Sequence, residues 1–244
     1  MPIQYLRRLS GRDRSTDANR QLALFLAFNA GAANAGGFLA VHQYTSHMSG
    51  IVSAMADDLA LGNLALLLAG LGALLSFLFG AATSAILINW GRRRTLQSEY
   101  ALALLLEALL LLLFGAVGTE AQAHRWLFVP ATVALLCFIM GLQNAMITKI
   151  SRSEIRTTHV TGLVTDIGIE LGKMIYFDTN VMADWPRLRL LAALLFLFFF
   201  GGVVGALGFS HAGFGAIIPF AAGLSMLALV PVVDDLREWW QAKR

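Results

Sequence analysis

The stretch YALALLLEALLLLLFGAVG, Tyr100–Gly118, contains one charged side chain, Glu107, among residues that are otherwise apolar, aromatic or small. An α-helix rises about 1.5 Å per residue, so about 20 such residues cover the ~30 Å hydrocarbon core of a bilayer. The stretch therefore predicts a helix that crosses a membrane.

The whole chain has the same character. Apolar residues make up 57% of its 244 residues and charged residues 14%, and the mean hydropathy is +0.68. Soluble domains carry about 25% charged residues, and a water-soluble core could not bury this much apolar surface. The composition indicates a membrane protein whose first partner is the lipid bilayer.

Six stretches are long and apolar enough to cross a bilayer. They are Gln21–Val41, Asn63–Trp90, Tyr100–Gly118, Trp126–Thr148, Leu188–Phe209 and Phe214–Val233. Two shorter segments, Met48–Gly62 and His159–Met174, also have a helical pattern, but they are only partly apolar and carry acidic residues.

Positive charge decides whether the short segments also cross. With six crossings and a cytoplasmic N-terminus, 17 of the 18 Lys and Arg residues lie on the cytoplasmic side, and Arg125 lies outside. If the short segments crossed too, Arg92–Arg94 would move outside, against the positive-inside rule. We therefore predict six crossings, both termini in the cytoplasm and an uncleaved signal anchor as first helix. The short segments then re-enter the membrane, lie at its surface or fill a cavity in the protein.

Several classes of site are excluded by charge and cysteine content. The pI is about 9.4, but no basic stripe with interleaved aromatic residues is present, so no nucleic-acid partner is expected. Cys137 is the one cysteine, which excludes an intramolecular disulfide and a Cys-rich metal site. We expect no metal and no cofactor. Because a Gly-rich phosphate loop, a His-Glu-x-x-His pair and a nucleophile elbow are missing, no enzyme activity is predicted.

A short motif occurs twice in the chain. SHMSGIVS, Ser46–Ser53, matches THVTGLVT, Thr158–Thr165, in residue chemistry at every position and at a constant separation of 112 residues. The same separation relates Asp58 to Glu170. Internal similarity of this kind is typical of a structural repeat.

Each half contains three spans, and because three is odd, the second half is inverted relative to the first. Inverted repeats with interrupted helices are common in secondary transporters. The predicted fold class is an all-α membrane protein with six transmembrane helices in two inverted three-helix repeats, each with a short broken or re-entrant helix. A basic N-terminal segment, the two repeats and an amphipathic tail are predicted at residues 1–20, 21–118, 126–233 and 234–244.

Residues around the motif also resemble a known family. The first half reads Asn34-Ala-Gly-Gly-Phe38 and then Thr45-Ser-His-Met-Ser-Gly50, and the second reads Gln143-Asn144-Ala145 and then Thr158-His-Val-Thr-Gly162. With these residues the chain resembles the YoaK-like family of bacterial multi-pass membrane proteins, which is defined by a domain of unknown function (DUF1275). The resemblance implies a multi-pass protein of the bacterial inner membrane and no particular activity.

The two motif copies are the first candidates for a binding site. Ser or Thr before a helix caps unpaired N–H groups, and a helix start inside the membrane offers donors and partial positive charge to an anion. His47 and His159 stand beside that start and can titrate near neutral pH. A structural cap with a packed histidine is the alternative. The predicted solute-binding residues are Asn34, His47, Ser49, Gly50, Asn144, His159, Thr161 and Gly162.

Acidic residues at membrane depth usually line a pathway or find a partner. The residues predicted to couple transport to protons or ions are Asp58, Glu107, Asp166 and Glu170. Solvation of the short helices at the membrane interface is the alternative for three of them. For Glu107 the alternative is a neutral structural carboxyl that bonds to Asn34, Asn144 or a hydroxyl.

The leading interpretation is a small secondary transporter, coupled to protons or ions, whose two motif segments meet near the midplane and contact a small solute that can be anionic. A channel on the same scaffold, an intramembrane enzyme and a lipid-binding factor are the alternatives. Gly201-x-x-x-Gly205 predicts helix packing or dimerisation. At 26.4 kDa the chain is small for a carrier, which is compatible with a homodimer.

Overall fold

A computed structural model describes residues 2–12, 14–120, 125–151, 155–176 and 182–243. Every regular element in those ranges is helical, which confirms the predicted all-α class. In chain order the elements are α1 (Pro2–Ser10), α2 (Thr16–Val41), α3 (Met48–Ala60), α4 (Leu64–Arg93), α5 (Ala101–Glu120), α6 (Arg125–Ile150), α7 (Val160–Ile175), α8 (Trp185–Ala212), the 3-10 turn η2 (Gly213–Ala216) and α9 (Ile217–Ala242).

Each of the six predicted spans overlaps a long helix, and the two short segments form α3 and α7. By length and hydropathy, five segments of the described chain could cross a membrane, and the fifth, Trp185–Ala242, contains both α8 and α9. The chain turns between these two helices at η2, where Gly213 adopts a φ of 55° that strains residues with a Cβ. The helix α1, within the basic N-terminal segment, was not predicted.

Local sequence signals set the starts of several helices. Ser15 caps α2 by accepting a hydrogen bond from the Ala18 N–H, and Asp17 lies in the first turn. Asp184 caps α8 in the same way, accepting from the Arg187 N–H, and a proline follows in the first turn. These residues satisfy or remove N–H groups that a helix start otherwise leaves unpaired.

The first close helix contact joins α2 to α8. Gly31 faces the backbone carbonyl of Phe198, and Gly201 faces the backbone carbonyl of Phe28. A Cβ on either glycine would overlap the carbonyl oxygen opposite, so the two helix backbones are in direct contact. The predicted packing role of Gly201 is thereby confirmed, within one chain.

The second close helix contact joins α4 to α6 and has the same form. Gly80 faces the carbonyl of Phe138, and Gly141 faces the carbonyl of Phe77. All four helices therefore carry a Phe-x-x-Gly sequence at the point of contact. The Phe-x-x-Gly sequence of α6 lies 110 positions after that of α2, and the one of α8 lies 121 positions after that of α4.

Both pairs run in parallel. Along α2 and α8, the next contact after the crossing places Gly36 against the ring of Phe209. Along α4 and α6, Lys149 donates a hydrogen bond to Asn89 Oδ1 at 2.8 Å near the ends of both helices. In each pair, later residues of one helix thus meet later residues of the other.

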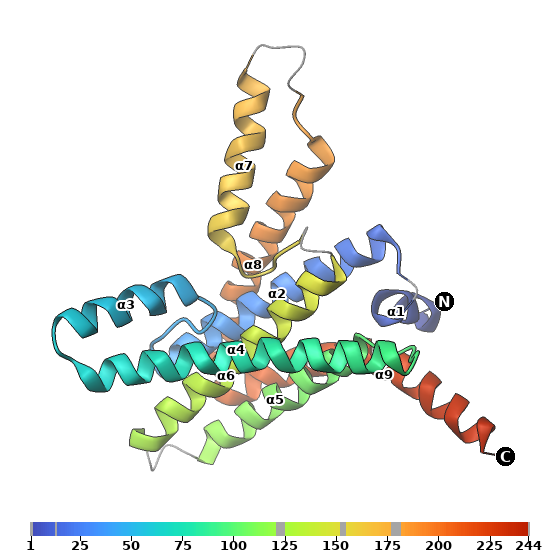
Figure 1. Ribbon diagram of the computed structural model, residues 1–244, viewed down its shortest axis with the longest axis horizontal. Helices are drawn as coiled ribbons and strands as arrows, with labels where there is room; N and C mark the ends of the chain where they lie inside the picture. The colour runs from blue at the N-terminus through green and yellow to red at the C-terminus, as the bar shows by residue number, and fades with distance from the viewer. Residues whose placement is uncertain (1, 13, 121–124, 152–154, 177–181, 244) are drawn as a thin grey trace.

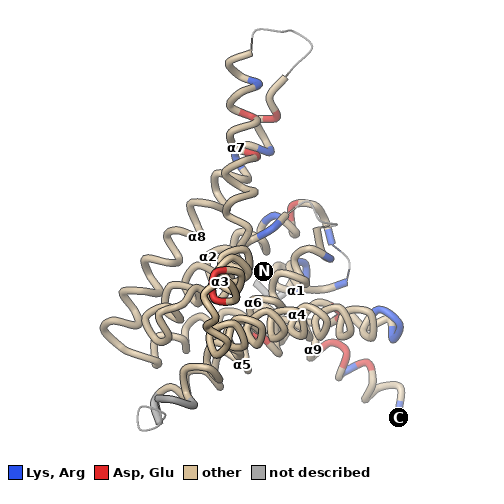
Figure 2. The backbone as a smooth tube through the Cα atoms, turned by 60° about the vertical axis from the view of Figure 1, so that its left-hand side comes forward, with Lys and Arg blue, Asp and Glu red and all other residues tan. Residues whose placement is uncertain are grey.

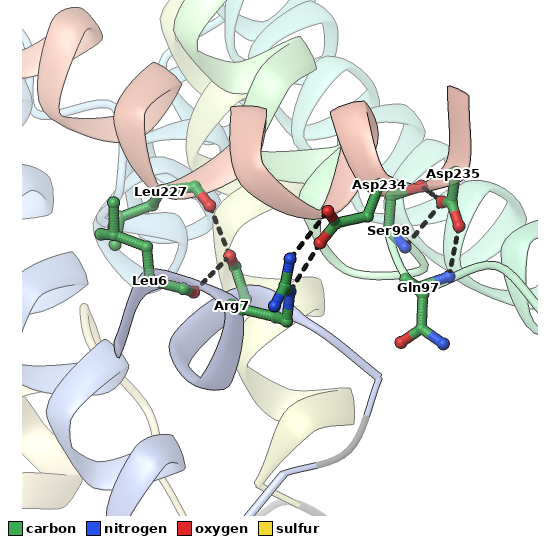
Figure 3. A network of polar contacts seen from close by, with 8 residues as sticks. Leu6, Arg7, Gln97, Ser98, Leu227, Asp234 and Asp235 are labelled. Carbon is green, nitrogen blue, oxygen red and sulfur yellow. Dashed lines mark hydrogen bonds and ion pairs between the residues drawn. The ribbon is translucent and has the colours of Figure 1, made fainter. Parts of the chain in front are cut away.

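In contrast, α9 runs back along α5. Ile217 at the start of α9 packs against Gly115 near the end of α5. Asp235, late in α9, accepts hydrogen bonds from the N–H groups of Gln97 and Ser98 at 2.8 and 2.9 Å, just before α5 begins (Figure 3). The direction of the chain therefore reverses between α8 and α9.

Basic residues gather at the end of the bundle where α2 and α5 begin and where α4, α6 and α9 end, and further ones lie along α7 and the start of α8 (Figure 2). At this basic end, Arg14 lies over the ring of Tyr100 at 5.4 Å from its centroid, and Arg92 donates to the Tyr100 hydroxyl at 3.0 Å. The helix α1 is clamped to α9 here, because Arg7 donates two hydrogen bonds to Asp234 at 2.7 and 2.8 Å (Figure 3). The opposite end is called the far end below.

Two helical hairpins project from the bundle. In the first, α3 packs against α4, and in the second, α7 packs against α8. Figure 1 shows the first hairpin extending to the left and the second toward the top, so their tips point away from each other. The two segments that were predicted to meet near the midplane therefore lie apart.

Gly80→Ala tests the backbone contact between α4 and α6. The new methyl group would overlap the Phe138 carbonyl, and overpacking of this kind costs about 1–3 kcal/mol. We expect a lower midpoint of thermal unfolding in detergent. Gly72→Ala is the matched control on the same helix, because nothing lies within 4 Å of its Cβ position. Equal midpoints for the two variants would contradict the contact.

Candidate functional site

Each motif copy forms a joint between two helices. At the joint between α2 and α3, Ser46 donates its hydroxyl to Asn34 Oδ1 at 3.0 Å and its N–H to the same oxygen at 3.3 Å. At the joint between α6 and α7, Thr158 donates its hydroxyl to Asn144 Oδ1 at 2.6 Å. In both halves of the chain the motif thus ties the end of one helix to the start of the next.

The histidine of each copy lies against the glycine that follows it. His47 and His159 occupy the position before α3 and α7, and both are exposed. Each ring folds back over Gly50 or Gly162, where a Cβ would overlap it. A side chain at either glycine would displace the histidine ring from this position. The predicted hydroxyl caps are not formed at these two helix starts, because the hydroxyls before the histidines bond to the asparagines instead.

A second hydroxyl residue recurs in both joints and was missed by the sequence reasoning. Thr45 and Thr157 are buried, and neither hydroxyl has a hydrogen-bond partner among the described residues. They precede the two motif copies at the same separation of 112 residues, which is the signal that could have identified them. Each joint thus contains an unsatisfied buried hydroxyl, which is uncommon in proteins.

The structure separates the predicted solute-binding residues into two groups. Those of the first joint lie at the far end, where α2 ends, and those of the second lie at the basic end, where α6 ends. Ser49 and Thr161 are exposed on α3 and α7. The far-end group is Asn34, His47, Ser49 and Gly50, and the basic-end group is Asn144, His159, Thr161 and Gly162.

Of the predicted coupling residues, the two carboxylates of α7 have cationic partners. Arg187 lies 3.1 Å from Asp166 Oδ2. Glu170 is buried and accepts hydrogen bonds from Lys173 Nζ and from the Asp184 N–H, both at 2.8 Å. The Lys173 hydrogen bond, followed by the Asp184 N–H, holds the pKa of Glu170 below its usual value. These contacts fasten α7 to the start of α8.

Asp58 lies on α3, partly exposed, with no side-chain partner among the residues that the structure describes. It is separated from the α7 carboxylates by the divergence of the two hairpins (Figure 1). The structure therefore does not bring the four predicted coupling residues together.

Glu107 belongs to a buried polar cluster in the centre of the bundle. Glu107 on α5 is 1% exposed and Gln143 on α6 is 0% exposed. Gln143 Nε2 donates to Glu107 Oε1 at 2.9 Å and to the Leu26 carbonyl at 3.4 Å. Gln143 thus links the carboxylate of α5 to the backbone of α2.

Two oxygen atoms of this cluster have no hydrogen-bond partner among the described residues: Glu107 Oε2 and Gln143 Oε1. No described cationic side chain pairs with Glu107. A buried ionised carboxylate without a cation is costly. The cluster is therefore suited to hold a proton on Glu107 or a small cation between its oxygens. In the described ranges no three His, Cys, Asp or Glu side chains group as a metal site.

A large cavity opens at the basic end. Its volume is about 980 Å³, and it lies between the starts of α2 and α8 and the joint from α6 to α7. Six of the described residues that line it are basic: Arg12, Arg14, Arg20, Arg92, Lys149 and Arg187. Sequence reasoning assigned these charges to topology, because no pattern in the chain shows that they converge.

Four phenylalanines pack together at the far end. Phe214 in η2 lies 5.4 Å from Phe114, 6.0 Å from Phe128 and 6.1 Å from Phe209, measured between ring centroids. A Cβ on Gly118 would overlap the Phe214 ring. The aromatic cluster therefore fills the end of the bundle that is opposite the basic cavity.

The fold and these sites define a helical protein whose long apolar segments suit a membrane. Its core contains a carboxyl group, Glu107, without a cationic partner among the described residues. The chain belongs to the family described as "Protein of unknown function (DUF1275)", whose model matches residues 22–230. The resemblance inferred from the two asparagine segments is thereby confirmed. Neither the curated proteins nor the solved structures compared with this chain include a match.

Glu170→Gln tests whether this carboxylate fastens α7. We expect the α7 amides to exchange several-fold faster with solvent at neutral pH, because glutamine loses the charge-assisted bond to Lys173. Since the pKa of Glu170 is lowered, its stabilising effect is complete above the ordinary Glu value and is lost as the pH falls through the lowered value. The difference from wild type should therefore shrink in acid.

Hydrogen exchange followed by mass spectrometry measures this effect. Glu238→Gln, at an exposed position of α9, is the control and should leave α7 unchanged. Wild-type exchange of α7 in the Glu170 variant would show that the hairpin does not depend on the carboxylate.

Proposed function

We propose that the chain is a small secondary transporter of the bacterial inner membrane, with both termini in the cytoplasm and with Glu107 as its proton-carrying group. The six long helices each cross the bilayer, and residues 21–118 and 126–233 form two inverted three-helix repeats. The single observation that carries the proposal is the burial of Glu107 in the bundle core with an amide as its partner.

The helix contacts support the inverted repeat. The contact of α2 with α8 corresponds to the contact of α6 with α4, since both are parallel and both use Phe-x-x-Gly sequences. The Asn–hydroxyl joints correspond as well, and they occur at opposite ends of the bundle. Reversal of the chain at η2 supports counting α8 and α9 as separate crossings.

The arrangement of cavity, acid and aromatic cluster supports transport. Solute enters the basic cavity, which lies beside Tyr100. Glu107 lies seven residues further along α5, about 10 Å deeper at 1.5 Å per residue. The phenylalanine cluster then closes the far end. An open end, a central ionisable group and a closed end are the features of one state in an alternating-access cycle.

The joints act as the two mirrored contact points that solute meets in turn. This role revises the idea of a single central site, because the far-end and basic-end groups lie apart. The exposed rings of His47 and His159 supply polar contacts at each entrance. Asp166 and Glu170 keep a structural role, since their cations already satisfy them.

Glu107→Gln tests proton coupling in proteoliposomes. A panel of inorganic and organic anions, amino acids and nucleobases is first screened by thermal shift, and the best solute is used for flux. A carrier that moves one proton with each solute reaches about tenfold accumulation per unit of pH gradient, since one unit corresponds to about 1.4 kcal/mol. We expect the variant to lose this accumulation and to retain exchange of labelled for unlabelled solute, because glutamine cannot carry a proton.

Asp57→Asn, at an exposed position of α3, is the matched control and should accumulate solute like wild type. Gradient-driven accumulation in Glu107→Gln would remove Glu107 from the coupling role. A leak at channel rates that ignores the gradient would favour a channel, and turnover of solute without flux would favour an enzyme.

Cysteine labelling tests the proposed orientation. In a Cys137→Ser background, Gln43→Cys places a thiol in the loop between α2 and α3, and Arg94→Cys places an exposed thiol at the basic end. A membrane-impermeant reagent applied to intact spheroplasts should label Gln43→Cys and should label Arg94→Cys only after permeabilisation. The reverse pattern would place the termini outside.

A further inference from the structure

We propose that the basic cavity binds a phosphate group carried on an organic body. Six cationic side chains from α2, α4, α6, α8 and the segment before α2 line it, against one described carboxylate, Asp184. Arginine binds phosphate through two parallel hydrogen bonds, and converging arginines are a common form of phosphate site. Binding of the phosphate group to the cavity does not depend on transport. The further statement that the phosphate belongs to the transported solute rests on the proposed function.

Much of the positive charge in the cavity is uncompensated. Within the described part of the chain, Arg12 and Arg20 have neither an ion-pair partner nor a hydrogen-bond partner. Lys149 donates only to the neutral amide of Asn89, at 2.8 Å. A ligand anion would therefore not need to displace an existing carboxylate from these three groups.

Arg14 is held in place with one nitrogen free. Its Nε donates to Asn19 Oδ1 at 2.6 Å and its Nη1 donates to the Leu9 carbonyl, while the guanidinium stacks on Tyr100. The remaining nitrogen, Nη2, is buried and has no acceptor among the described residues. Burial lowers the pKa of Arg14 to about 10. A bound anion would satisfy Nη2 and offset this desolvation.

Topology alone does not account for the arrangement. The positive-inside rule requires only that basic residues lie on one side of the membrane, and exposed side chains such as Arg93 and Arg94 meet that requirement without lining the cavity. Arg92 and Arg187 have carboxylate partners, but Arg12, Arg20 and Lys149 have none among the described residues, and their convergence on one cavity costs electrostatic repulsion. That cost is relieved when an anion occupies the cavity.

One wall of the cavity indicates that the phosphate is attached to an organic group. Leu190 of α8, beside the buried Leu191, Leu194 and Ile155, gives part of the cavity an apolar lining. A volume of about 980 Å³ is also larger than inorganic phosphate requires and falls at the upper end of ligand pockets. A soluble organic phosphate and the headgroup of an anionic lipid share this chemistry.

Thermal shift of the purified protein in nanodiscs distinguishes the two sources. In discs of neutral phosphatidylcholine, stabilisation by added glycerol 3-phosphate, compared with glycerol and chloride at equal ionic strength, identifies a soluble phosphate. Stabilisation only when phosphatidic acid replaces part of the neutral lipid identifies a headgroup. Either result supports the proposal. If neither glycerol 3-phosphate nor phosphatidic acid stabilises the protein, the proposal is overturned.

Two variants assign the binding to this cavity. Arg20→Gln and Lys149→Gln should each weaken binding of the active probe about tenfold, the effect of one lost charge-assisted hydrogen bond. Arg93→Gln makes the same charge change at the same end of the bundle outside the cavity, so it should bind like wild type. Equal affinities in all three variants would overturn the assignment. The two proposals can fail separately. If the cavity binds the phosphate probe but Glu107→Gln still accumulates solute like wild type, only the proton-coupling proposal is contradicted.

Discussion

The direct contact of helix backbones at two crossings determines the rest of the arrangement. At each crossing two glycines remove the side chains that would keep the helices apart, and the carbonyls of Phe28, Phe77, Phe138 and Phe198 lie against them. In a bilayer no hydrophobic force drives helices together, because lipid tails are as apolar as leucine. Close packing of small residues therefore has to hold these pairs, and the glycines permit it.

The position of the cavity follows from the same contact. Helices that cross at an angle and touch near their middle separate toward both ends. Toward the basic end the starts of α2 and α8 separate, and the cavity lies between them. Toward the far end the ring of Phe209 fits against Gly36, where a Cβ would overlap it, so aromatic side chains fill the space. A rigid rotation about the crossings would open one end as it closes the other, which is the motion that the proposed transport cycle requires.

Hydropathy predicted the long helices and the two short segments, because it depends on local composition, but it did not predict α1 in the polar N-terminal segment. Contacts between side chains of different helices could not be predicted in the same way. The partner of Glu107 is Gln143, whereas Asn34, Asn144 or a hydroxyl had been expected, since helix rotation and crossing angle decide which polar groups meet. The clamp of α1 on α9 through Arg7 likewise joins residues at opposite ends of the sequence. The Phe-x-x-Gly sequences were not predicted to correspond, because copies of this sequence are 110 and 121 positions apart, whereas the two copies of the Ser/Thr-His motif are 112 positions apart.

Three carboxylates are buried among the described residues, and Glu107 is the exception within that set. Glu99 has Arg92 at 3.6 Å and Glu170 has Lys173 at 2.8 Å, so each of these two carboxylates has a cationic partner. A cation beside Glu107 would favour the charged carboxylate and would oppose the uptake of a proton. The amide of Gln143 suits both states, because its Nε2 donates to the carboxylate and its unsatisfied Oε1 can accept from the protonated acid. A partner that stabilises either form without fixing one is what a proton carrier in a membrane requires.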